Sequence, residues 1–185
     1  VKNVLYRIHF GDYGGYALKI ISFILGIITC FVIISGVMIW LVARDKKSMP
    51  ENKRRFNRRV VRIYLAICLS MYPITALTFI AAKVFNPLGQ SGLYTLYFVG
   101  WLLLTIFFIV KRNDAFTNKY CLLSGSILGF LIPITNGMIT GNWFWNSFIT
   151  NQFQLFFVDV FWIVLASISF YISWIKIKST NQKRE

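Results

Sequence analysis

The sequence predicts an all-α integral membrane protein, a bundle of about five transmembrane helices with its N-terminus outside the membrane and its C-terminus in the cytoplasm. Of its 185 residues, 57% are hydrophobic and 18% are aromatic, which is more apolar than an ordinary globular domain. The apolar residues form long runs close to the ~20 residues that a bilayer-spanning helix needs. The basic residues lie between these runs. Composition, run length and charge placement therefore all favour a multi-pass membrane protein.

The five predicted spans are residues 19–43, 60–82, 93–110, 120–140 and 154–175. The first is too long for the apolar region of a signal peptide and ends in a basic loop, so we expect it to remain as a helix. The third is the shortest, and Gly92 and Lys111 mark its ends. Residues 1–18 are then an outer-face segment, residues 19–175 the transmembrane bundle, and residues 176–185 a basic cytoplasmic tail.

The orientation follows from the 20 Lys and Arg residues, which greatly outnumber the six Asp and Glu residues. Loops rich in Lys and Arg stay in the cytoplasm. Eight basic residues lie in the segment 44–59, and alternation places Arg62, the loop 111–119 and the tail on the same side, for a total of sixteen. The outer side keeps four: Lys2, Arg7, Lys19 and Lys83.

Other classes of protein fit the sequence poorly. The net charge of +14 could suggest a nucleic-acid partner, but the cations follow the spans rather than a basic helix, so we expect a lipid bilayer and no nucleic acid. Cys30, Cys68 and Cys121 lie far apart in apolar runs and form no metal or redox motif. No phosphate-binding loop, nucleophile elbow or zinc-protease motif is present.

Small residues at helical spacing indicate where helices pack, because transmembrane helices approach each other closely at such positions. Gly125 and Gly129 form a GxxxG pattern, followed by Pro133. Two further stripes are Gly26, Thr29 and Gly36 in the first span, and Ala166, Ser169 and Ser173 beyond Asp159 and Trp162 in the last.

Asp159 is the only acidic residue inside a predicted span, and an intramembrane carboxylate is a functional candidate by default. It lies about a turn and a half after Gln154, near the predicted outer interface, where water or Lys83 could stabilise it. A structural polar contact and a proton or ligand site are both open.

The single histidine, His9, lies ahead of the first span among Gly11, Gly14 and Gly15. Glycines allow the backbone to turn sharply or to approach a flat ligand. His9 is therefore either an interfacial polar residue or part of a cofactor site. One histidine cannot form a bis-histidine haem site or a multi-histidine metal site alone.

Several motifs resemble the PepSY-associated transmembrane proteins of bacteria. They are Ile8-His-Phe-Gly-Asp-Tyr-Gly-Gly15, Lys19, and Ile34-Ser-Gly-Val-Met-Ile-Trp40 before a basic loop, with a looser likeness over residues 60–80. Complete members are similar to one N-terminal helix, a periplasmic PepSY region, and then a segment like this one. The resemblance, together with a first residue that is Val rather than Met, implies a C-terminal fragment.

The resemblance implies a place in the bacterial inner membrane and a role in iron uptake. Some members are haem-containing reductases that release iron from ferric siderophores at the periplasmic face. Carried to this chain, it implies haem b with His9 as one axial ligand and the second ligand on the missing helix. The alternatives are a non-catalytic anchor for a periplasmic PepSY regulatory domain and, more weakly, a small-molecule transporter using Asp159 and Lys83.

Overall fold

The computed structural model describes residue 4 and residues 15–44, 49–85 and 89–182, and in this part of the chain every regular element is a helix. The helices are α2 (Gly15–Arg44), α3 (Glu51–Val84), α4 (Gly89–Lys111), α5 (Asp114–Thr140), α6 (Phe144–Ile149) and α7 (Phe153–Gln182). All of them except α6 are long and apolar enough to cross a membrane. The predicted all-α fold with five membrane-spanning helices is confirmed for the described residues.

Local sequence explains where several helices begin and end. Asn113 caps the start of α5, where its side-chain oxygen accepts the Phe116 backbone N–H at 3.0 Å. Gly141 ends α5 in the left-handed conformation, with φ of 71°, and its N–H returns to the Gly137 carbonyl. Pro50 precedes α3, where its carbonyl accepts the Lys53 N–H at 3.0 Å. Caps of this kind place the turns between the long apolar runs.

The chain divides into two units, residues 1–58 and residues 59–185. The first contains α2 and the first residues of α3. Helix α2 has 30 residues, a length of about 45 Å, which exceeds the ~30 Å of a bilayer's hydrocarbon core. The first residues of α3 are polar and exposed, and Arg55 forms an ion pair with Glu51 at 2.8 Å. The apolar part of α3 begins after Arg59 and contains one cation near its start, Arg62.

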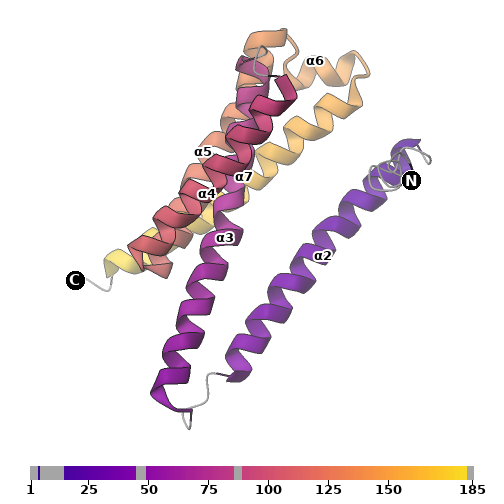
Figure 1. The fold of residues 1–185 in the computed structure, drawn as a ribbon. Coiled ribbons are helices and arrows are strands. Elements are labelled where there is room, and N and C mark those ends of the chain that lie inside the picture. The colour runs from indigo at the N-terminus through magenta and orange to yellow at the C-terminus, as the bar shows by residue number, and fades with distance from the viewer. Residues whose placement is uncertain (1–3, 5–14, 45–48, 86–88, 183–185) are drawn as a thin grey trace. The chain divides into compact units, whose positions relative to one another are not determined.

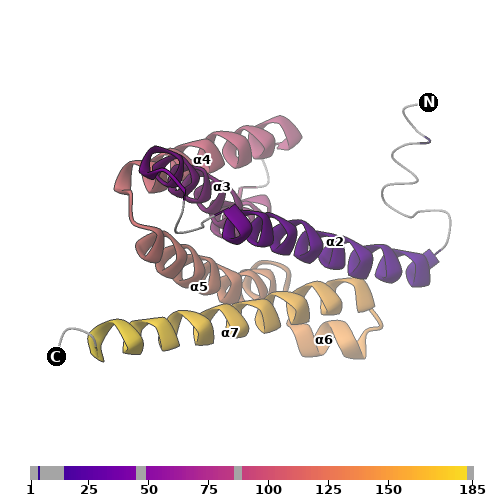
Figure 2. The same cartoon turned by 90° about the horizontal axis from the view of Figure 1, so that it is seen from below.

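In the second unit, α5 and α7 run antiparallel and side by side, with the short α6 in the turn between them (Figures 1 and 2). Their register is visible at two points. A Cβ added at Gly129 would lie 3.1 Å from the Ala166 Cβ, and the Ser173 hydroxyl donates to the Lys119 carbonyl at 3.4 Å. Gly129 of the GxxxG pattern therefore packs against Ala166 in the small-residue stripe of α7.

Helices α3 and α4 are joined by polar contacts inside the unit. The hydroxyls of Ser70 and Thr105, both buried, are 2.8 Å apart. The indole N–H of Trp101 donates to the Ile67 carbonyl at 3.1 Å. In lipid, buried polar groups of this kind must find partners within the protein. These bonds hold α4 against α3.

Two apolar clusters make up the core of the second unit. One is centred on Ala66, Phe108 and Cys121, from α3, α4 and α5. The other is centred on Ala76, Ile132 and Trp162, from α3, α5 and α7. Helices α3 and α5 both contribute to the two clusters, so they are the two central helices of this unit.

Candidate functional site

The predicted cofactor residues His9, Gly11 and Gly14 lie outside the described residues. Gly15 is described, and it is the first residue of α2, with φ of +62°. That backbone conformation suits glycine because other residues meet a steric penalty there. The start of α2 therefore has a backbone conformation for which glycine is the best suited residue.

Asp159, the predicted intramembrane acid, lies on the face of α7 that packs against α5, and it is only 2% exposed. Its carboxylate oxygen Oδ2 accepts a hydrogen bond of 3.2 Å from the side-chain amide of Asn136 on α5. Asn136 is itself 3% exposed. The two residues form a buried polar pair across the α5–α7 contact.

Asn136 also connects this pair to the α5–α6 turn. Its amide nitrogen lies 3.5 Å from the Asn142 carbonyl, and its own backbone carbonyl accepts the Thr140 hydroxyl at 2.7 Å. The same hydroxyl accepts the Asn142 backbone N–H at 3.2 Å. The Asn142 side chain then donates to Gln152, which precedes α7, at 3.2 Å. Asp159 is thus the inner end of a hydrogen-bonded network that closes the turn between α5 and α7.

Aromatic side chains close the space beside this network. The Trp143 ring covers Gly137, where an added Cβ would lie 2.6 Å from two ring carbons. Trp143 stacks on Trp145 with ring centroids 5.2 Å apart. Trp143, the residue that precedes α6, therefore packs on α5.

Lys83, the predicted partner of Asp159, is not among the ion pairs of the described residues, which join Arg55 to Glu51 and Arg62 to Asp114. Within the described part of the chain, the direct partner of Asp159 is Asn136. Sequence inspection missed Asn136, although a lone amide inside an apolar span is a signal of the same kind as a lone acid. Only the antiparallel register of α5 and α7 pairs the two.

The packing stripe predicted on α7 is also buried. Trp162, Ala166, Ser169 and Ser173 are each at most 5% exposed. Tyr72 of α3 completes this region: its ring stacks nearly parallel to Trp162, with centroids 6.3 Å apart, and covers Gly125 of α5. Because side chains of the chain itself fill this space, the α3–α5–α7 region is a packed support.

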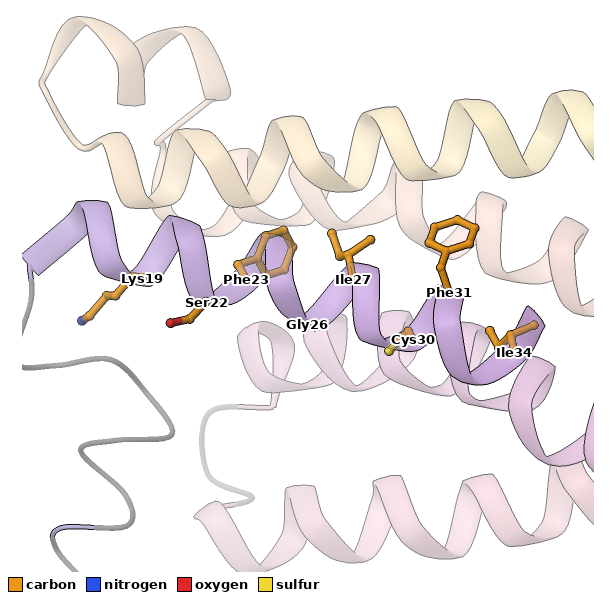
Figure 3. A pocket seen from close by; sticks show the side chains of 8 residues that line it. All are labelled: Lys19, Ser22, Phe23, Gly26, Ile27, Cys30, Phe31 and Ile34. Atoms are coloured by element: carbon orange, nitrogen blue, oxygen red, sulfur yellow. The ribbon is translucent and has the colours of Figure 1, made fainter. Parts of the chain in front are cut away.

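Helix α2 presents an apolar stripe on which Phe23, Ile27, Phe31 and Ile34 line a shallow hollow, with Gly26 and Cys30 between them (Figure 3). Lys19 and Ser22 lie at its N-terminal end. Gly26 belongs to the small-residue stripe predicted for this span. Large and small side chains therefore alternate along this surface of α2. Such a surface suits contact with another helix or with lipid chains.

The described residues contain no group of three or more His, Cys, Asp or Glu side chains that could hold a metal ion. The acid of the described interior is bound to an amide, and the chemistry it can perform alone is limited to accepting hydrogen bonds or a proton. The remaining candidate chemistry belongs to the segment that precedes α2.

Comparison with known proteins bears on that segment. Residues 1–43 match the family model of the PepSY-associated TM region. The match covers the His-Phe-Gly motif and nearly all of α2, so the resemblance seen in the sequence is confirmed there. No curated protein and no solved structure matches the chain. The chain is therefore similar to the PepSY-associated TM region over residues 1–43, and it contains five helices that are long and apolar enough to cross a membrane.

Proposed function

We propose that this chain anchors a PepSY region of the same protein in the bacterial inner membrane, with its N-terminus in the periplasm and its C-terminus in the cytoplasm. The observation that carries the proposal is the contrast between the two parts of the chain. The family match is confined to residues 1–43, whereas the interior of α3–α7 is filled by its own side chains. In this proposal the second unit holds the protein in the membrane, and the function depends on the outer-face segment 1–18.

The orientation can be tested by cysteine labelling in spheroplasts, in a variant whose native cysteines are replaced by alanine. Thr150→Cys and Ala115→Cys are both at exposed positions. Residue 150 lies in the α6–α7 turn and residue 115 at the start of α5, so α5 separates them. A membrane-impermeant maleimide should label residue 150 in intact spheroplasts and residue 115 only after lysis. Labelling in the opposite order would overturn the orientation.

The anchoring role can be tested on the full-length protein by an assay of the PepSY region itself. Deleting the outer-face segment should abolish its function, and His9→Ala should leave it intact. Asp159→Asn, which keeps a polar side chain of the same shape beside Asn136, serves as the matched control inside the bundle. If His9→Ala alone abolishes function while deletion of the rest of the segment does not, the anchoring role is excluded.

A second candidate function is a haem-binding component that passes electrons to a ferric siderophore or another iron chelate at the periplasmic face. The observation that favours it is that His9 lies inside the matched segment. The described residues contain no histidine, so α2–α7 form no bis-histidine site. Haem b would supply one-electron chemistry when bound, and His9 would be one of its two axial ligands. If the other ligand is also a histidine, it comes from outside this chain.

The haem assignment is tested by purifying the full-length protein from cells supplied with excess haem. A Soret band that His9→Ala removes, while Asp159→Asn preserves it, would support the assignment. A colourless wild-type protein would refute it. A transport role for Asp159 and Lys83 is disfavoured by the direct bond from Asn136 and by the 2% exposure of Asp159, so we assign Asp159 a structural role.

A further inference from the structure

Cationic side chains gather at one end of the second unit, which we call the basic end. They are Arg59 and Arg62 on α3, Lys111 and Arg112 at the end of α4, and Lys119 on α5. The acid that accompanies them is Asp114, at the start of α5. At the other end of α3, the cation is Lys83 alone. The second unit therefore presents a strong excess of positive charge at one end of its apolar helices.

Arg62 is fixed at this end by one hydrogen bond, and its other N–H groups can still donate. Its Nε donates to the Asp114 carboxylate at 3.3 Å, and the two side chains are 27% and 44% exposed. The two terminal nitrogens of its guanidinium have no hydrogen-bond partner among the described residues. A guanidinium fixed by Nε presents the remaining N–H groups as a fork suited to a phosphate.

Aromatic rings support the neighbouring lysines. The Lys111 ammonium lies 5.6 Å from the Phe107 ring centroid and 5.9 Å from that of Phe116. The Lys119 ammonium lies 5.4 Å from the Tyr120 ring centroid. Lysine stems that run along aromatic surface while the charged group reaches toward the polar region are characteristic of the membrane interface.

Arg112 supplies an exposed guanidinium in the turn between α4 and α5. Its φ of +51° is a conformation that glycine adopts more easily than arginine. The turn therefore carries a charged side chain at a position where the backbone alone would favour glycine. Arg112 lies two residues before Asp114, to which Arg62 is bonded, so the cations of three helices converge around one turn.

We propose that the basic end binds the phosphodiester headgroup of an anionic phospholipid. Its cations lie where apolar helices end, because α4 ends at Lys111 and α5 begins at Asp114. That position corresponds to the headgroup depth of a bilayer that the helices cross. Basic clusters between transmembrane helices at this depth are suited to anionic lipid headgroups. The apolar flanks favour a lipid over an acidic soluble protein, which would need a surface outside the membrane.

The test is a native mass spectrometry titration of the full chain in neutral detergent, with phosphatidylglycerol and phosphatidylcholine of identical acyl chains. Wild-type protein should prefer phosphatidylglycerol. In Lys111→Gln/Arg112→Gln, the apparent affinity for phosphatidylglycerol should fall by about 25-fold, about fivefold for each charge removed, and the affinity for phosphatidylcholine should not change. Lys83→Gln, which removes a cation at the opposite end, is the matched control and should retain the preference.

Two further variants separate charge from folding. Arg112→Gly relieves the positive φ, so it should keep or raise the melting temperature while lowering phosphatidylglycerol affinity about fivefold. Arg112→Lys should restore most of that affinity. Raising the ionic strength should weaken the preference, because salt screens exposed charges.

Equal affinity of the wild type for both lipids would overturn the proposal, and an acidic protein partner would become the better explanation of the charge. A loss of preference in Lys83→Gln as large as in the double variant would also overturn it. So would unchanged affinity in Arg112→Gly.

Discussion

Replacing Gly125 with alanine should destabilise the second unit by wedging α5 away from α3. An added Cβ would overlap the Cδ1 and Cε1 atoms of the Tyr72 ring and lie 2.9 Å from its Cγ. The ring has little room to retreat, because it stacks on Trp162, which is 4% exposed and meets the edge of Phe79 at 5.3 Å. Overpacking of this kind costs about 1–3 kcal/mol.

The magnitude can be bracketed by a second glycine on the same helix. At Gly129 an added Cβ would meet the Ala166 Cβ at 3.1 Å, which a shift of a few tenths of an ångström relieves. Gly129→Ala should therefore cost less than Gly125→Ala, at or below about 1 kcal/mol. Both changes remove a helical glycine, so the intrinsic gain in helix propensity, about 0.5–1 kcal/mol, is common to both and cancels in the comparison.

The assay is equilibrium unfolding by sodium dodecyl sulfate in mixed micelles, followed by circular dichroism and tryptophan fluorescence. A double-mutant cycle isolates the contact: Tyr72→Leu removes the ring, so Gly125→Ala should cost little in that background. The expected coupling is about 1–3 kcal/mol. If the two single changes add within about 0.5 kcal/mol, or if Gly129→Ala costs more than Gly125→Ala, the wedge argument is wrong.

Three further predictions concern buried groups. Ser70→Ala should lower the free energy of unfolding by about 1 kcal/mol, because it leaves the Thr105 hydroxyl without its 2.8 Å partner. The double variant Ser70→Ala/Thr105→Val should cost less than the sum of the two single changes. The same unfolding titration measures both. Asn136→Leu should destabilise the α5–α7 contact by about 0.6–1.7 kcal/mol through loss of the bond to Asp159; full stability of this variant would contradict the assigned role. Cys121, kept as the sole cysteine, should resist a maleimide in the folded protein and react after unfolding, because its side chain is fully buried; rapid labelling of the folded form would show that the α3–α4–α5 core is open.

Much of the fold was predictable from the sequence because a bilayer imposes a simple constraint. A helix must be long and apolar to cross the hydrocarbon, so the runs at 19–43 and 154–175 identify spans without knowledge of any contact. Each predicted span falls within one of the helices. The helices extend further than the predicted spans. Helix α3, for example, begins at Glu51, so the polar residues before Val60 are helical as well. Hydropathy identifies the part of a helix that crosses the membrane, but it does not show how far the helix continues into the polar region.

The candidate site was only partly predictable. Asp159 was recognisable because an acid within an apolar run is energetically costly in a membrane. Its partner Asn136 was not, because it lies 23 residues away and an amide is a weaker signal. The network through Thr140, Asn142 and Gln152 depends on the shape of the α5–α6 turn. Periodicity carries no information about that shape. The placement of His9, Gly11 and Gly14 lies outside the described residues and stays a prediction from motif and family resemblance.

The sequence by itself determined that this chain crosses a membrane about five times, and it pointed to the PepSY-associated family through the motifs around His9 and Lys19. It also indicated the small residues of α5 and α7 that pack, because helical spacing places them on one face. Only the tertiary structure decided what they pack against: Gly125 beneath Tyr72, Gly129 against Ala166, and Asp159 against Asn136. The physical reason is that burial in lipid depends on the composition of one helix, whereas contact depends on the register between two.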